Sequence, residues 1–182
     1  MKNQIQKTTK ISKNLTLTGM MGVGKSTIGK NLAKKLKYNF FDTDKLIEAE
    51  EGASINSIFK NKSEIYFRKL ESKVTLQAQK TKNSVIALGG GAFLNKSIRS
   101  YSKKTSISFW LDIDLGILTT RLIKTNKRPL LNKKNNIRDV IKQIYVEREK
   151  IYSQADFRIK CNFLKTNDIV NKILKLYEKS SS

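Results

Sequence analysis

Residues 19–26, which read GMMGVGKS, constrain the fold more strongly than any other part of this chain. They match the pattern G-x-x-x-x-G-K-[ST], in which backbone N–H groups surround phosphate oxygens between a strand and a helix. An apolar run at residues 15–18 precedes this segment, and a segment of helical period at residues 25–37 follows it. The pattern predicts a phosphate-binding loop in an α/β fold. The alternative is a glycine-rich turn with an incidental lysine.

Short apolar runs alternate with amphipathic segments along the rest of the chain, which is typical of βαβ units. The further strands that we expect are residues 38–41, 84–88, 106–111 and 156–161. The further helices that we expect are residues 54–61, 63–81, 96–103, 114–125, 137–155 and 167–179. These elements predict a three-layer α/β/α fold around a five-stranded parallel sheet.

The length of 182 residues suits one domain with a hydrophobic core. Residues 1–13 are polar and basic without periodicity, so we expect a flexible tail there and a single domain over residues 14–182. Residues 126–136 contain the only proline and predict a mobile lid, although a plain connector fits their composition equally well. No apolar stretch is long enough for a membrane span or a secretory signal, so we expect a cytoplasmic protein without membrane association.

Residue counts exclude several classes of chemistry. The chain has one cysteine, Cys161, and no histidine. These counts exclude an internal disulfide, a zinc cluster and His-based catalysis. The net charge of +22 favours anionic partners. Lysines account for 30 of the 37 basic residues and are spread along the chain, which is typical of a solvated surface. We therefore expect no specific nucleic-acid partner.

Two carboxylates, Asp42 and Asp44, follow the predicted second strand, at the sheet edge where open α/β folds bind ligands. One can orient the water shell of Mg²⁺, and the other can accept a hydrogen bond or a proton from a substrate hydroxyl. The predicted third strand ends in glycine instead of an acidic residue, so Asp42 is the better carboxylate for the metal side. The alternative is that Asp44 caps a helix that begins at Lys45.

Two arginines stand in positions that suggest anion binding. Arg68 and Glu71 are three residues apart on a predicted helix and can pair, although an ordinary surface ion pair explains the spacing as well. Arg148 falls on the apolar stripe of its predicted helix. The other residues of that stripe are Ile141, Ile144, Tyr145 and Tyr152. A charge that faces inward needs an anionic partner, either an internal carboxylate or a bound anionic ligand.

Three consecutive glycines, Gly89, Gly90 and Gly91, end the predicted third strand. They allow the backbone to approach a ligand closely, or they form a tight turn.

Together these segments resemble the shikimate kinase family, from about Leu15 to the C-terminal helix. The segments that carry the resemblance are GMMGVGKST at 19–27, FFDTD at 40–44, FRKLE at 67–71, ALGGGA at 87–92, RPLL at 128–131 and EREKIY at 147–152. The resemblance implies a P-loop kinase fold related to that of nucleoside monophosphate kinases. It also implies a cytoplasmic monomer that uses ATP and Mg²⁺ to phosphorylate the 3-hydroxyl of shikimate in the chorismate pathway.

The resemblance assigns roles to individual residues. The implied catalytic residues are Lys25, Asp44 and Arg128, the last of these on the lid. The implied ATP-binding residues are Gly22, Val23, Gly24, Lys25, Ser26, Thr27, Arg121 beside the adenine, and Arg128. The implied shikimate-binding residues are Asp44, Arg68, Gly89, Gly90, Gly91 and Arg148, with both arginines on the carboxylate and Glu71 fixing Arg68. Mg²⁺ would be held by Ser26 and, through water, by Asp42.

Two other functions compete with this interpretation. A gluconate-type sugar-acid kinase would share the phosphate loop and an arginine-bound carboxylate. A non-catalytic, nucleotide-dependent module would use the positive charge to bind nucleic acid.

Overall fold

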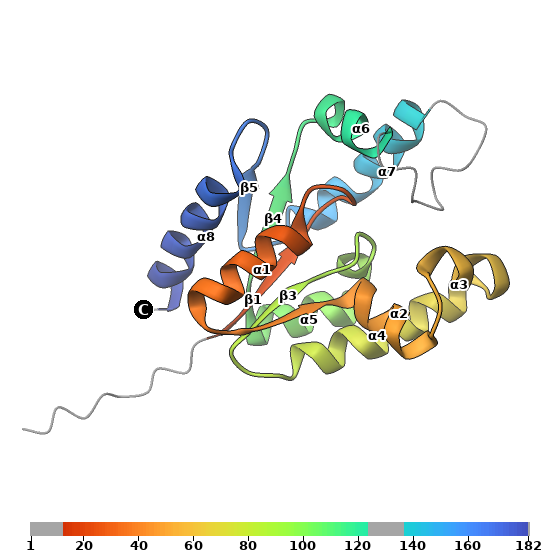
Figure 1. Cartoon of the computed structure of the whole chain (residues 1–182), viewed down its shortest axis with the longest axis horizontal. Helices are drawn as coiled ribbons and strands as arrows, with labels where there is room; N and C mark the ends of the chain where they lie inside the picture. The colour runs from red at the N-terminus through yellow and green to blue at the C-terminus, as the bar shows by residue number, and fades with distance from the viewer. Residues whose placement is uncertain (1–12, 124–136, 182) are drawn as a thin grey trace, which may run out of the picture.

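The structure is a computed structural model that describes residues 13–123 and 137–181. Five parallel strands form one sheet in the order β2-β3-β1-β4-β5, which confirms the predicted sheet (Figure 1). The strands are β1 (Asn14–Thr18), β2 (Asn39–Asp42), β3 (Ser84–Ala87), β4 (Ser106–Asp112) and β5 (Phe157–Lys160). Every residue of β1, β3 and β4 is buried, as expected for parallel strands that are covered on both faces.

Helices cover both faces of the sheet and complete the three predicted layers (Figure 1). On one face lie α1 (Lys25–Leu36) and α8 (Thr166–Ser181), which pack against each other. On the other face lie α4 (Glu64–Gln79) and α5 (Lys96–Thr105), which also contact each other. The main core lies between these layers and contains fully buried Leu15, Leu17 and Phe109.

The remaining elements surround the carboxyl ends of the strands. They are α2 (Thr43–Glu51), α3 (Ile55–Asn61), the short 3-10 helix η1 (Ala92–Leu94), α6 (Leu115–Ile123) and α7 (Ile137–Tyr152). Helix α2 packs against α3 and α4, and α7 packs against α6 and η1. A smaller core of Ile47, Ile58, Phe67, Leu70 and Val74 joins α2, α3 and α4. This group of helices forms one wall of the site described below.

Helix α2 is absent from the helices that the sequence predicts. Its sequence, TDKLIEAEE, offers only Leu46 and Ile47 as large apolar residues, so its helical period is weak. Burial of Ile47 against α4 supplies the packing that the isolated segment lacks. Asp42 is the N-cap, because its side chain accepts a hydrogen bond from the backbone N–H of Lys45 at 3.4 Å. The alternative in which Asp44 caps this helix is therefore wrong.

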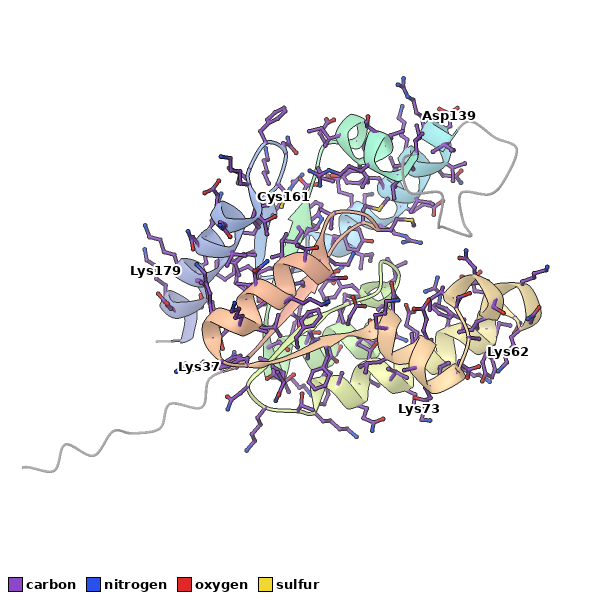
Figure 2. The ribbon with its side chains drawn as sticks, in the orientation of Figure 1. Lys37, Lys62, Lys73, Asp139, Cys161 and Lys179 are labelled. Carbon is purple, nitrogen blue, oxygen red and sulfur yellow. The ribbon has the colours of Figure 1, made fainter. Side chains whose placement is uncertain are left out.

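Part of the sequence interpretation lies outside the described residues. Of the predicted tail, residues 1–13, only Lys13 is described, and its carbonyl accepts a hydrogen bond from Tyr177. The predicted lid, residues 126–136, lies wholly outside, and Arg128 with it. Within the described part of the chain, no helix is both long enough and apolar enough to cross a membrane. The labelled lysines in Figure 2 lie at the periphery on several elements, as a diffuse surface charge requires.

Candidate active site

The loop between β1 and α1 adopts the backbone conformation that its glycines permit. Gly19, Gly22 and Gly24 have φ angles of 130°, 79° and 100°, in the left-handed region that other residues rarely adopt. At Gly19 a side chain would also collide with the carbonyl oxygen of Leu111 in β4. The loop therefore lies directly against the end of the sheet, with the N-terminus of α1 behind it. This is the geometry that binds phosphate groups.

Lys25 lies across this loop and is almost fully buried. Its Nζ donates hydrogen bonds to the carbonyl oxygens of Gly19 at 2.8 Å and Met20 at 2.9 Å. A pocket opens beside it. Its lining residues include Gly22, Gly24, Ser26, Thr27 and Asp42. Val23 is not among them, since its side chain packs in the core and its backbone N–H donates to Met20 at 3.4 Å.

Ser26 and Asp42 form the oxygen-rich side of the same pocket. The Ser26 hydroxyl donates to Asp42 Oδ2 at 2.5 Å. A hydroxyl and a carboxylate fit Mg²⁺, which prefers oxygen ligands and keeps several waters and phosphate oxygens in its shell. Among the described residues, no group of three or more Asp, Glu, Cys or His side chains forms a metal cage. These two side chains thus suit a metal that arrives with its nucleotide.

A second pocket adjoins the first and contains both candidate arginines. Its lining residues are Met21, Asp44, Ile55, Phe59, Phe67, Arg68, Glu71, Gly90, Gly91 and Arg148. The α2–α4 wall contributes the apolar side, and α7 contributes Arg148. Met21, Asp44 and Gly90 line both pockets. Asp44 therefore stands where the phosphate pocket meets the pocket that holds the arginines.

Arg68 and Glu71 pair across one turn of α4, as the sequence predicts. Arg68 Nη1 donates to Glu71 Oε2 at 2.7 Å. The Glu71 side chain is only 4% exposed, so the ordinary surface ion pair is the wrong alternative. Burial raises the pKa of Glu71, and the nearby charge of Asp44 adds to this increase, while Arg68 and Arg148 oppose it. A second carboxylate, Glu64, accepts from Arg68 at the protein surface.

Arg148 is 8% exposed, which confirms the inward position that the helical stripe predicts. Its Nη1 donates to the carbonyl oxygen of Gly90 at 3.2 Å, and the hydroxyl of Tyr152 donates to the same oxygen at 2.5 Å. Within the described part of the chain, no carboxylate forms an ion pair with Arg148. The charge of buried Glu71 acts on Arg148 without an ion pair, so the internal-carboxylate alternative holds only in part. A buried guanidinium group beside a pocket is suited to an anionic ligand.

Two of the three glycines pass so close to the site that a side chain there would displace a neighbouring one. A Cβ at Gly89 would collide with Asp44 Oδ1, and one at Gly91 would lie 2.5 Å from Arg68 Nη1. The backbone N–H of Gly89 also donates to Thr43 Oγ1 at 2.8 Å, which holds the loop against α2. The close approach of Asp44 and Arg68 to this loop thus explains why residues 89 and 91 are glycines.

Besides Val23 and Gly89, which line neither pocket, two predicted site residues are not brought together with the others. Arg121 lies exposed near the end of α6 and lines neither pocket, although its charge acts on the Cys161 thiol. Arg128 lies outside the described residues.

Sequence reasoning missed several residues of the site. Met21 lines both pockets, Phe59 and Phe67 form the apolar wall, and Tyr152 holds Gly90. Phe59 and Phe67 read as ordinary apolar helix positions, so their spacing carries no functional signal. For Tyr152, its place on the same stripe as Arg148 is the signal that points to the site.

Comparisons with known proteins agree on one family. A family model described as shikimate kinase matches residues 21–178. The shikimate kinase of Persephonella marina is 43% identical over 162 residues, which are 89% of this chain and 97% of that protein. A solved shikimate kinase from Acinetobacter baumannii, in complex with shikimate, has 31% identity and a TM-score of 0.89, covering 94% of this chain and 96% of that one. A gluconokinase from Sinorhizobium meliloti 1021 has 12% identity and a TM-score of 0.63, covering 94% and 95%, which is a likeness of fold alone.

Proposed function

The chain belongs to the shikimate kinase family, and from this premise we propose that it transfers the γ-phosphoryl group of ATP to the 3-hydroxyl of shikimate. The products are shikimate 3-phosphate and ADP. The observation that carries the proposal is the position of Asp44 between the phosphate pocket and the pocket that holds Arg68 and Arg148. A hydroxy acid bound by its carboxylate would present its ring hydroxyls at this junction.

The second pocket supplies the groups that recognise a hydroxylated carboxylic acid. Arg68 and Arg148 offer planar guanidinium groups, which suit a carboxylate better than a lysine ammonium does. Glu71 holds Arg68 from behind at 2.7 Å, so less side-chain freedom is lost when the substrate binds. Ile55 and Phe59 add apolar lining to the same pocket. This lining favours a ring that carries both polar groups and apolar surface.

Phosphoryl transfer requires mainly alignment and charge neutralisation. Asp44 accepts a hydrogen bond from the attacking hydroxyl and takes its proton as the new P–O bond forms and the bond to ADP breaks. Lys25 turns from the carbonyl oxygens of Gly19 and Met20 to the phosphate oxygens of ATP. The backbone N–H groups of the loop and the helix N-terminus add to the same positive field.

The roles of three other residues extend this proposal. Mg²⁺, which supplies charge neutralisation on the phosphates when it is bound, would be held by Ser26 and, through water, by Asp42. Arg121 would lie against the adenine, and Arg128 would contact the phosphoryl group during transfer. We expect the enzyme to act as a monomer.

A coupled assay of ADP release with Mg·ATP tests the proposal, with shikimate, quinate, gluconate and no acceptor compared side by side. We expect strong stimulation by shikimate alone. Stimulation by gluconate instead would favour the sugar-acid kinase and would contradict the roles given to Arg68 and Arg148. No turnover with any acceptor would favour the nucleotide-dependent binding module. In that case filter binding to nucleic acid would be tight, steeply dependent on salt and responsive to ATP.

A further inference from the structure

Helix α7 has contacts on two flanks. On one flank, Arg148 and Tyr152 donate to the carbonyl oxygen of Gly90 at 3.2 and 2.5 Å. On the other flank, Tyr145 faces Asp112 of β4 and Glu149 faces Arg158 of β5. At about 100° per residue, these four side chains span roughly a quarter to a third of the helix circumference, with Arg148 and Glu149 at its two limits. Contacts at Glu149 and Tyr145 therefore affect the direction in which Arg148 points.

One carboxylate, Asp112 at the end of β4, joins this second flank to the sheet. It is 8% exposed. Its Oδ2 accepts a hydrogen bond from Arg158 Nε of β5 at 3.0 Å and lies 2.9 Å from Arg158 Nη2 in an ion pair. Its Oδ1 accepts from the hydroxyl of Tyr145 at 3.2 Å. Asp112 thus connects β4, β5 and α7 through a single side chain.

Aromatic contacts connect Arg158 to Tyr152 through Trp110. The guanidinium carbon of Arg158 lies 4.3 Å from the ring centroid of Trp110, and the Trp110 ring lies 6.1 Å from the Tyr152 ring. Arg158 also approaches Glu149 at 3.8 Å. Burial raises the pKa of the Tyr145 phenol, and the charges of Asp112 and Glu149 add to this increase, so the hydroxyl stays protonated and donates. None of these groups lines either pocket.

We propose that Asp112 is a positioning residue: by holding Tyr145 and Arg158 it sets the rotation of α7 and thereby directs Arg148 into the substrate pocket. The inference rests on the proposed role of Arg148 in binding the substrate carboxylate. A side chain that reaches about 6 Å from the axis of its helix moves by about 1 Å when the helix rotates by roughly 10°. A displacement of about 1 Å can cost as much as ~100-fold in rate when it affects aligned groups.

The first test compares Asp112→Asn with Asp156→Asn. Asparagine at 112 has the same shape but loses the charge opposite Arg158. Asp156 is the matched control, because its carboxylate also accepts hydrogen bonds from β4, from Ser108 N at 2.8 Å and Ser108 Oγ at 2.6 Å. These contacts lie near the opposite end of the strands. We expect Asp112→Asn to raise the KM for shikimate about 5- to 20-fold, with the KM for ATP within about twofold. Asp156→Asn should leave both KM values unchanged.

The second test is a double-mutant cycle with Arg148→Ala. If Asp112 acts through Arg148, Asp112→Asn will not raise the KM for shikimate any further once Arg148 is absent. Effects that multiply would overturn the inference, as would equal increases in both KM values. Arg158→Lys provides a milder change that keeps the charge but breaks the double contact with Asp112, and it should give a smaller increase in the same direction. If Asp112→Asn unfolds below the assay temperature, Arg158→Lys is used for the test in its place.

The outcomes separate this inference from the proposed function. If Arg148→Ala raises the KM for shikimate and neither Asp112→Asn nor Arg158→Lys does, the positioning role alone is wrong. If Arg148→Ala leaves the KM for shikimate unchanged, the assignment of Arg148 fails and the positioning role fails with it.

Discussion

Replacement of Arg148 by alanine separates a substrate-binding role from a structural one. The change removes a guanidinium group that is 8% exposed and that forms no ion pair within the described residues. The carbonyl oxygen of Gly90 keeps its hydrogen bond from Tyr152 at 2.5 Å. Because Gly90 keeps Tyr152, Glu71 keeps Arg68 and a buried charge is lost, we expect the free energy of unfolding to change by only about 1 kcal/mol.

The effect on substrate should be much larger. Loss of one partner from a buried, hydrogen-bonded charge pair costs about 2–4 kcal/mol. At about 1.36 kcal/mol per tenfold, this predicts a loss of roughly 30- to 1,000-fold in kcat/KM for shikimate. The KM for ATP should stay within about twofold, since Arg148 does not line the phosphate pocket.

The assay is steady-state ADP release with each substrate varied in turn, together with a thermal melt. Lys142→Ala is the control, because Lys142 is exposed on the same helix and its loss removes the same charge. Equal losses for both substrates, or a large fall in melting temperature with unchanged KM values, would refute the reasoning and make Arg148 structural.

Three further predictions follow from individual contacts. Asp44→Asn should lower turnover by about 100-fold or more and leave ATP affinity nearly unchanged, as checked by single-turnover kinetics and nucleotide titration. Gly91→Ala places a Cβ 2.5 Å from Arg68 Nη1, so the KM for shikimate should rise about tenfold while the KM for ATP does not. Burial raises the pKa of the Cys161 thiol from 9.0 to about 11, so at pH 8 its thiolate fraction falls by about 100-fold, and iodoacetamide should alkylate the native protein at least that much more slowly than the unfolded protein. An equal alkylation rate in both states would contradict the burial of Cys161.

Local backbone chemistry explains why the phosphate loop and the sheet are predictable from the sequence. Gly19, Gly22 and Gly24 adopt left-handed φ angles that few other residues tolerate, so their spacing alone indicates the loop. Strands β1 and β4 are buried on both faces, and the large apolar residues Leu15, Leu17 and Phe109 make them recognisable although serines and threonines alternate with them.

The sequence did not predict helix α2, and it did not predict that the ion pair of Arg68 with Glu71 is buried. The nine residues of α2 have few apolar positions, and Ile47 finds its partners on helices that follow later in the chain. The spacing of Arg68 and Glu71 predicts that they pair, but it does not indicate whether the pair is buried or exposed to solvent. Glu71 is buried because the glycine loop and Asp44 pack over it.

The sequence by itself determined which chemical groups this protein has and which ones local geometry requires: the loop glycines, Lys25 and Ser26, the two aspartates, and an arginine on an apolar stripe. Only the tertiary structure decided which of them meet. Asp44, Glu71 and Arg148 come from α2, α4 and α7, and the parallel sheet brings these helices together at the carboxyl ends of its strands. A local pattern can indicate a buried face, as it does for Arg148, but the charges that meet there depend on neighbours that are distant in sequence.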